Sequence, residues 1–548
     1  MQKYQQVATI AATLSVVMGQ VAWAAPAISN SQDELRESMP TNNASIALKN
    51  ETPTSNISED SATFHLKKLI VDTDIKFSDE NSGIRQIVEK YANKEVSLAD
   101  LRSAVNEVTL YFRGHGYPAA TAYLPPQNIK EGIAHISIEP GRFGNINIDN
   151  KSHVKTSVIE RITKGLKQGE IIRGKELESS VYNIIGLGGV KAGAIMRPGA
   201  KQGVTDIVVK VEDGKRDGYV LYAENHGSKS SGRYRYGLTA DWYEMAGIGD
   251  HLSVNVLISN KRQHNYGARY DLSVGRTGTR LGIGISSTDY ELGSDLSSLG
   301  AIGRAHTYSI FGTTPLWRTG TAGVNIGYGW DYRNMRDEMR SVGYSVEKHS
   351  NAFHLGVNGF QQYAKTLVTY DLTGYVGNLT GDNAHISDIP LTVEPEGHYN
   401  KAVLNASAVH AFNREWDFLL KFQAQKSGTN LDSSEKIYLG GANAVRAYPQ
   451  GEGSGDEGYQ TTAELRYHTK IPGLVLSTYF DMGHVKYTHD GAIPGGTTLK
   501  GWGIGVAWSR PNDFFARFDY ARRIGLPNNA TDDAKSKQRM WFQVGKVW

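Results

Sequence analysis

From residue 215 to Trp548 the sequence consists of short segments in which apolar and polar residues alternate, and the periodicity of helices is absent. In the segment that begins near residue 249, Leu252, Val254, Val256 and Ile258 lie on one face, and Ser253, Asn255 and Ser259 lie on the other. Successive side chains of a strand point to opposite faces, so this alternation marks a strand with one apolar and one polar face. More than half of the chain is therefore restricted to β-structure.

We count sixteen such segments, which begin near Asp217, Gly232, Gly249, Asn265, Thr279, Arg304, Gly320, Ser350, Lys365, Tyr399, Arg414, Gly458, Gly473, Leu499, Asp513 and Gln538. A soluble sandwich can alternate in the same way, but here the apolar faces are aromatic toward their ends and the chain closes on Trp548. An even number of strands of ~10 residues is typical of an outer-membrane barrel, and closure gives every backbone amide a partner in hydrocarbon. We expect a 16-stranded antiparallel transmembrane β-barrel over residues 214–548.

The chain begins with a targeting segment. Lys3 supplies a positive start, Val7–Met18 is an uncharged apolar run, and Ala22-Trp23-Ala24 fits a small-x-small cleavage site. The alternative, a membrane-anchoring helix, needs ~20 apolar residues, and this run is shorter. Residues 1–24 are therefore expected to be a signal peptide that directs the chain to the periplasm.

Residues 25–61 are polar and rich in Ser, Thr and Asn, which is typical of a flexible linker. A short helix is expected after Ser31, because a capping residue is followed there by acidic residues. Whether this N-terminal segment plugs a pore or has no role is left open.

Two tandem α+β units are expected between the linker and the barrel. Residues 62–139 show the order β-α-α-β-β, and residues 140–213 repeat it. Apolar residues at helical spacing, such as Leu101, Val105 and Val108, indicate the helices. Each small mixed sheet should leave an edge open to an added strand from an extended partner.

The composition argues against several classes of function. A net charge of +3 without a basic run argues against a nucleic-acid partner, and the absence of cysteine excludes disulfides and thiolate metal sites. The glycine cluster at residues 186–190 lacks the Gly-Lys-Ser/Thr of a phosphate loop, and Gly453-Ser454-Gly455 lacks the spacing of a nucleophile elbow. The chain is therefore expected not to be an enzyme and to need no cofactor and no metal.

A glycine-rich loop at residues 426–457 joins two alternating segments and carries Val445-Arg446-Ala447-Tyr448 at its centre. This centre is too apolar for a solvated surface flap, so we expect the loop to fold into the barrel lumen, with Val445 and Tyr448 as its few apolar anchors. On the thirteenth alternating segment Tyr479, Asp481 and Gly483 share the inward face. An aspartate that faced lipid would be costly, whereas in a partly wet lumen it can accept two hydrogen bonds from Arg446. An ordinary structural ion pair is the alternative on these residues alone.

These motifs resemble those of the TpsB transporters of two-partner secretion, the haemolysin secretion/activation family. That family carries Val-Arg-Gly-Tyr at the tip of its sixth extracellular loop, which Val445-Arg446-Ala447-Tyr448 matches except for its alanine. It also carries Phe- or Gly-x-Asp-x-Gly on strand thirteen, which Tyr479-Phe480-Asp481-Met482-Gly483 matches except for its tyrosine. The tandem units resemble the two POTRA domains of the family. The resemblance covers nearly the whole chain and implies that these residues form a lumenal loop lock.

The resemblance further implies an exporter in the Gram-negative outer membrane, with its POTRA domains in the periplasm, that moves an unfolded exoprotein to the cell surface. The cargo would be a haemolysin, an adhesin or a contact-dependent toxin, bound through its N-terminal secretion domain. Periplasmic chaperones are further expected partners, outer-membrane lipid surrounds the barrel, and we expect a monomer. Two alternatives stay open. The first is an insertase that assembles other barrels, although two POTRA-like units are few for such a protein. The second is a ligand-gated porin or receptor, although the periplasmic units would be hard to explain in that case.

Overall fold

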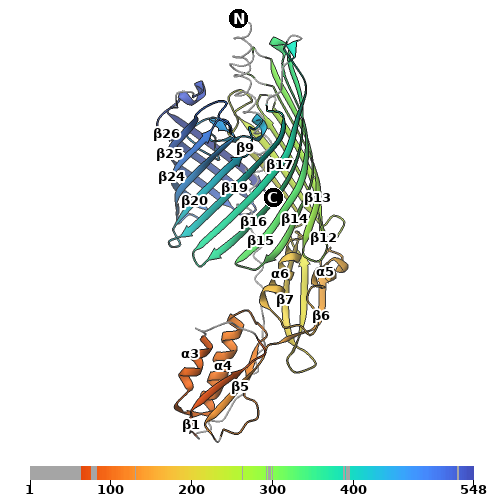
Figure 1. Cartoon of the computed structure of the whole chain (residues 1–548), viewed down its shortest axis with the longest axis vertical. Coiled ribbons are helices and arrows are strands. Elements are labelled where there is room, and N and C mark those ends of the chain that lie inside the picture. The colour runs from red at the N-terminus through yellow and green to blue at the C-terminus, as the bar shows by residue number, and fades with distance from the viewer. Residues whose placement is uncertain are drawn as a thin grey trace.

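The computed structural model of the chain shows a β-barrel with two small α/β units that follow one another below one of its rims (Figure 1). The structure describes residues 63–548 except 76–82, 130, 262, 292, 294–297, 299, 387–388, 391–394 and 528–529. The expected signal peptide and the N-terminal segment of residues 25–61 lie outside the described residues. Within the described ranges no helix is long and apolar enough to cross a membrane.

Sixteen long antiparallel strands of the described chain close the barrel, each paired with the next and the last with the first. They are β9 (Asp217–Glu224), β10 (Arg235–Tyr243), β11 (Asp250–Ser259), β12 (Gln263–Val274), β13 (Thr279–Glu291), β14 (Ala301–Arg318), β15 (Ala322–Met339), β16 (Tyr344–Tyr363), β17 (Thr366–Ile386), β19 (Gly397–Ala411), β20 (Trp416–Ser427), β23 (Glu457–His468), β24 (Leu474–Lys486), β25 (Gly496–Arg510), β26 (Phe514–Arg523) and β27 (Gln538–Val547). The two-residue β18 (Ile389–Pro390) pairs with the end of β17. The expected barrel is confirmed; the largest difference in a strand start is at β16, expected near Ser350 and beginning at Tyr344.

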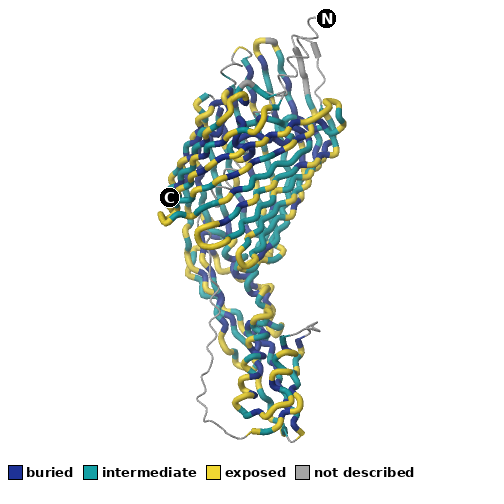
Figure 2. Tube along the Cα trace, turned by 90° about the vertical axis from the view of Figure 1, so that its left-hand side faces the viewer, coloured by how far each residue is buried: buried dark blue, intermediate teal, exposed yellow. Residues whose placement is uncertain are grey.

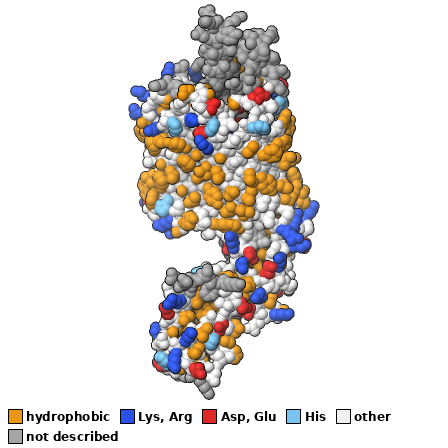
Figure 3. Space-filling model, viewed as in Figure 1, with side chains coloured by type: hydrophobic (Ala, Val, Ile, Leu, Met, Phe, Trp, Pro, Cys, Tyr) orange, Lys and Arg blue, Asp and Glu red, His pale blue; other side chains and the backbone are white. Residues whose placement is uncertain are grey.

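The alternation of the sequence becomes the two faces of the barrel wall. In β25 the exposed residues point outward, and the residues between them face the lumen: Trp502, Ile504, Val506 and Trp508 are the outward ones. Outward side chains of this kind form the apolar belt around the barrel in Figure 3, and the change of burial along the strands is visible in Figure 2. A belt of this kind is what the hydrocarbon of a membrane requires of a barrel's outer surface.

The first small unit packs two helices against short strands. Its elements are β1 (Thr63–Leu66), β2 (Lys68–Asp72), α3 (Gly83–Tyr91), β3 (Lys94–Ser97), α4 (Leu98–Gly114), β4 (Thr121–Tyr123) and β5 (Ile133–Glu139). β5 lies between a parallel β2 and an antiparallel β4, and β1 pairs with β3. The expected order β-α-α-β-β holds, except that the first strand is split and the short β3 separates the helices.

Helix α4 begins where the sequence supplies a reciprocal cap. The Ser97 hydroxyl accepts a hydrogen bond from the Asp100 amide at 3.2 Å, and the Asp100 carboxylate accepts one from the Ser97 amide at 2.8 Å. Two amide donors that the helix itself cannot satisfy are thereby paired. The bond from the Ser97 amide also lowers the pKa of the Asp100 carboxyl.

The second small unit repeats the expected order of strands and helices. Its elements are β6 (Arg142–Lys151), α5 (Thr156–Thr163), α6 (Gly174–Ile185), β7 (Val190–Pro198) and β8 (Val204–Asp213). β8 lies between a parallel β6 and an antiparallel β7. Apolar residues of both helices, such as Ile159, Leu177 and Ile184, are buried against this sheet.

The second unit is attached to the near rim of the barrel below β10–β15. Three contacts to different parts of the rim fix it: the Lys155 amide donates to the Gly247 carbonyl at 2.9 Å, the Arg161 guanidinium donates to the Ser273 carbonyl at 2.8 Å, and the Lys175 ammonium lies 3.9 Å from the centre of the Trp317 ring. Contacts to several turns restrain rotation as well as distance, so this unit is held at one side of the lumen's opening.

Candidate functional site

The loop between β20 and β23 begins at the rim far from the two small units and folds back into the lumen. Its neck is formed by β21 (Ile437–Tyr438), which pairs with β22 (Ser454–Gly455), and residues 439–453 form the loop tip. Leu439, Val445, Ala447 and Tyr448 of the tip are buried against the wall residues Tyr479, Leu499 and Ala521. The expectation that Val445 and Tyr448 are the loop's few apolar anchors is therefore wrong, because Leu439, Ala447 and the neck residue Ile437 are buried in the same cluster.

The structure brings Arg446 of the loop tip onto Asp481 of β24. The guanidinium donates from Nε to Oδ2 at 2.9 Å and from Nη2 to Oδ1 at 2.8 Å, and the Arg446 amide donates to Oδ2 at 3.2 Å. The Thr462 hydroxyl of β23 donates to Oδ1 at 2.9 Å. A planar guanidinium held by two parallel bonds has one orientation only, so this pair fixes both the place and the direction of the loop tip.

Two further carboxylates, which the sequence reasoning missed, bind the same guanidinium. Arg446 Nη1 lies 3.0 Å from Glu464 Oε2 of β23 and 3.3 Å from Asp519 Oδ1 of β26. Arg517 of β26 neutralises part of this acid cluster, with Nε 2.7 Å from Asp519 and Nη2 3.6 Å from Glu464. The sequence could have indicated both carboxylates, because Glu464 and Asp519 lie on the inward faces of strands close to β24.

The ion cluster is enclosed rather than partly wet. The side chains of Arg446 and Asp481 are exposed by only 4% and 1%. The Tyr479 ring covers the guanidinium, with its centre 3.1 Å from Cζ, and the Trp541 indole of β27 donates to the Arg446 carbonyl at 2.7 Å. The expectation of a partly wet pair is therefore wrong, and removing one partner of such a pair leaves the other charge buried.

Three small residues give the tip its room. Ala447 adopts an ordinary backbone conformation, because it is not among the described non-glycine residues with positive φ. A Cβ on Gly501 of β25 would lie only 2.4 Å from the Cβ of Ala447, which is too close for two carbon atoms. A Cβ on Gly483 would approach Leu439 Cδ2 of the loop to 2.7 Å. The wall glycines at residues 483 and 501 thus leave space for the loop, and the alanine at residue 447 needs no glycine-like conformation.

The arrangement is mechanical rather than chemical. The guanidinium of Arg446, which lies on a loop, is bound by carboxylates of three wall strands: Asp481, Glu464 and Asp519. Among the described residues no group of three or more His, Asp or Glu side chains is arranged to hold a metal ion. What the site can do is hold a lumenal loop in one position against the wall of β23–β27.

The fold and the site define an outer-membrane type of β-barrel with small units below one rim and a loop held inside the lumen. The sequence matches the family model described as haemolysin secretion/activation protein ShlB/FhaC/HecB over residues 203–508. It also matches the ShlB-type POTRA domain over residues 64–141, which is the first small unit. The chain therefore belongs to the haemolysin secretion/activation family.

Relatives and solved structures agree with this placement. The chain is 27% identical over 480 residues to the heme/hemopexin transporter protein HuxB of Haemophilus influenzae, covering 85% of this chain and 84% of the relative. CdiB from Escherichia coli has the same fold at 18% identity and a TM-score of 0.71, covering 95% of this chain and 98% of that one. CdiB from Acinetobacter baumannii matches with a TM-score of 0.68 at 16% identity, covering 97% and 99%. The chain is an outer-membrane translocator that exports a partner protein, and its POTRA region lies in the periplasm.

Proposed function

We propose that the chain exports one unfolded exoprotein from the periplasm to the cell surface, and that the Arg446 cluster locks the loop in the position that accepts this cargo. The observation that carries the proposal is the enclosed guanidinium, bound by carboxylates of three different wall strands. Because the loop tip is held against β23–β27, space remains for a passing chain between the loop and the rest of the wall. Val445, Arg446, Ala447, Tyr448, Tyr479, Asp481 and Gly483 are the lock residues in this proposal.

The space between the loop and the wall suits an unfolded polypeptide. Two cavities lie between the loop and the wall: one of about 510 Å³ along β15–β23 and one of about 530 Å³ along β11–β20. Uncharged polar side chains are frequent in the lining of the first, for example Asn325, Asn358 and Ser407. Such groups can exchange hydrogen bonds with any backbone amide and favour no particular sequence, which an export path for a long chain requires.

The two periplasmic units are the proposed receptor for the cargo's N-terminal secretion domain. We assign residues 62–139 and 140–213 as POTRA domains and residues 214–548 as the barrel, because the second unit repeats the strand and helix order of the first. Among the described residues the outer edges of β4 and β7 pair with no further strand. An extended cargo segment can add to such an edge through backbone hydrogen bonds, and the rim contacts of the second unit hold it below the lumen. The name of HuxB adds a heme- or hemopexin-linked partner to the haemolysin, adhesin and toxin classes.

Deletion of residues 62–139 tests the receptor role in the full chain. We expect secretion of the partner protein to stop while the barrel still reaches the outer membrane and shows the heat-dependent gel mobility of a folded barrel. Leu110→Ser, at an exposed apolar position on α4, is a milder companion variant that keeps the unit present. Normal secretion by the deletion variant would refute capture by the first unit.

A further inference from the structure

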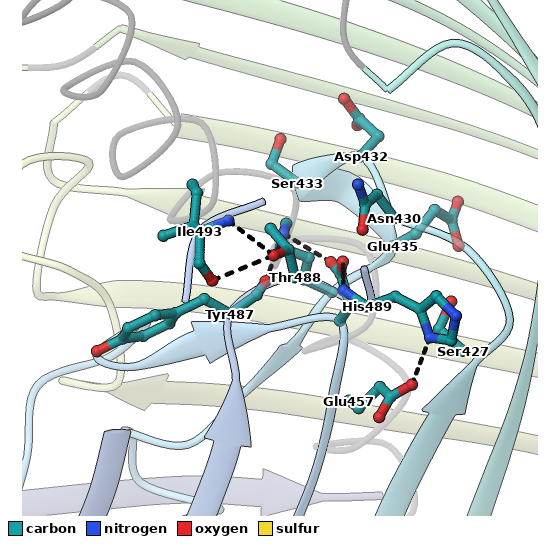
Figure 4. Close-up of polar contacts among 12 residues, drawn as sticks. Ser427, Asn430, Asp432, Ser433, Glu435, Glu457, Tyr487, Thr488, His489 and Ile493 are labelled. Carbon is teal, nitrogen blue, oxygen red and sulfur yellow. Dashed lines mark hydrogen bonds and ion pairs between the residues drawn. The ribbon is translucent and has the colours of Figure 1, made fainter. Parts of the chain in front are cut away.

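The loop has a second attachment, at its root, on the wall opposite the Arg446 cluster. The loop root, residues 428–436, leaves β20 and crosses in front of β19 and β17 toward β16 and β15. Leu431 of the root is buried against Ala352 of β16 and Tyr399 of β19. Figure 4 shows the root beside the turn that holds Thr488 and His489, with the carboxylates of Asp432 and Glu435 directed away from that turn. The loop thus spans the lumen from β15 to β27.

Two root carboxylates bind three wall cations. Asp432 Oδ2 lies 3.0 Å from Lys348 Nζ of β16. Glu435 Oε1 lies 3.0 Å from Arg333 Nη1 of β15, and Glu435 Oε2 lies 2.8 Å from Lys401 Nζ of β19. The charges are reversed relative to the tip, where the loop carries the cation and the wall carries the acids.

Two of the three wall cations, Lys348 and Lys401, also contact wall residues, whereas Asp481 has fewer partners besides Arg446. Lys348 is also 3.7 Å from Asp337 Oδ2 of β15, and Lys401 lies 5.3 Å from the centre of the Tyr375 ring. If the root moves away, these wall partners stay in place and part of the charge remains paired. If Arg446 moves away, Asp481 keeps only the Thr462 hydroxyl among its side-chain partners described above. An uncompensated buried charge is the main cost of breaking an ion pair, so the root separates more easily than the tip.

The root ion pairs also border open space, whereas the Arg446 ion cluster is enclosed and the tip meets a cavity only at Asn443 and Ala444. The cavity of about 530 Å³ is lined by Arg333, Lys401 and Glu435. Water and salt therefore reach two of the three root pairs, which weakens them with rising ionic strength. Movement of the root away from β15–β19 would enlarge this cavity, because Ser434, Glu435 and Lys436 of the root line it.

We propose that Asp432 and Glu435, with Arg333, Lys348 and Lys401, form a releasable clamp: the root separates from the wall to widen the lumen while the tip stays on β24. This proposal rests on the proposed export function, because the widened lumen would serve to let cargo pass. The clamp itself is defined without cargo, so its failure in a cargo-free measurement is distinct from a failure of export.

The test uses the full chain, which has no native cysteine. Ser434→Cys reports on the root, because the Ser434 hydroxyl is enclosed without a hydrogen-bond partner among the described groups. Ala444→Cys reports on the tip, where the alanine is buried. In folded barrels, Asp432→Asn with Glu435→Gln should raise maleimide labelling at residue 434 by about ten-fold or more and increase the frequency of channel openings in planar bilayers with KCl. Labelling at residue 444 should stay within about three-fold of the parent.

Asp289→Asn is the matched control, because Asp289 forms an exposed ion pair with Arg304 at 2.8 Å on the outer wall and should change neither readout. Unchanged labelling at residue 434 would overturn the clamp. A parallel rise at residue 444 would overturn it as well, since root and tip would then move together. If the double variant does not fold, the same test can be made on the chain without the two substitutions. Raising KCl from ~0.1 to ~1 M should then increase labelling at residue 434 and not at residue 444. A labelling rate at residue 434 that does not change with salt would refute the proposal.

Discussion

Arg446→Ala should free the loop tip from the wall. The substitution removes two bonds of 2.9 and 2.8 Å to Asp481 and leaves that carboxylate buried with the Thr462 hydroxyl. Loss of one partner from a buried pair costs ~3–5 kcal/mol. Arg517 lowers this cost, because it already binds Asp519 at 2.7 Å and lies 3.6 Å from Glu464. We therefore expect ~3 kcal/mol, the lower end of the range.

That free energy corresponds to an increase of about a hundred-fold in the undocked population, since ~1.4 kcal/mol is ten-fold. The assay is the maleimide labelling rate of Ala444→Cys in folded barrels, because residue 444 is buried when the tip is docked. Asp481→Ala should have a smaller effect, about ten-fold, because Arg446 keeps Glu464 at 3.0 Å and Asp519 at 3.3 Å. Arg510→Ala, which removes an exposed pair with Asp513 at 3.5 Å, is the control and should change little.

A double-mutant cycle tests whether the two residues act together. The variant with both substitutions should label no faster than Arg446→Ala by more than about three-fold, because the cation that Asp481 serves is already gone. Additive effects would show that the residues act separately. Labelling of Arg446→Ala at the parent rate would refute the lock, and the apolar contacts of Val445 and Tyr448 would then hold the tip alone. Secretion should fall in both single variants while barrel assembly is retained.

Two further predictions concern the tip and the rim. Gly501→Ala should undock the tip, because the new Cβ would lie 2.4 Å from that of Ala447; Ala447→Gly in the same chain should restore the parent labelling rate. Burial raises the pKa of Glu244, in the turn between β10 and β11, to about 7. Because this folded-state pKa lies above the ordinary glutamate pKa of 4.5, the turn should lose stability as pH rises from about 4.5 through about 7, and limited proteolysis of the turn should show it. Glu244→Gln should remove that pH dependence, although Asp250, Arg280 and Arg216 face the same carboxyl.

The sequence predicts strands that follow from local alternation of residues, and it misses contacts between residues that are far apart in the chain. The starts of β9, β13 and β27 follow directly from alternation, and Arg446 and Asp481 could be matched because each is an unusual residue in its segment. The short β3 was missed, since four residues between two helices carry too little pattern to detect. The root clamp was missed for a different reason: Lys348 and Asp432 are separated by 84 residues, and only the closed barrel places them 3.0 Å apart.

The opposite charge order at the two ends of the loop fixes its orientation across the lumen. The tip carries a cation that meets acids of β23, β24 and β26, and the root carries acids that meet cations of β15, β16 and β19. A loop that leaned the other way would place Arg446 among wall cations and Glu435 among wall acids. Like charges brought together in this way cost free energy, so they disfavour the reversed arrangement. In the proposed clamp, the root can therefore leave the wall of β15–β19, whereas the cations Arg333, Lys348 and Lys401 disfavour the tip at the same place.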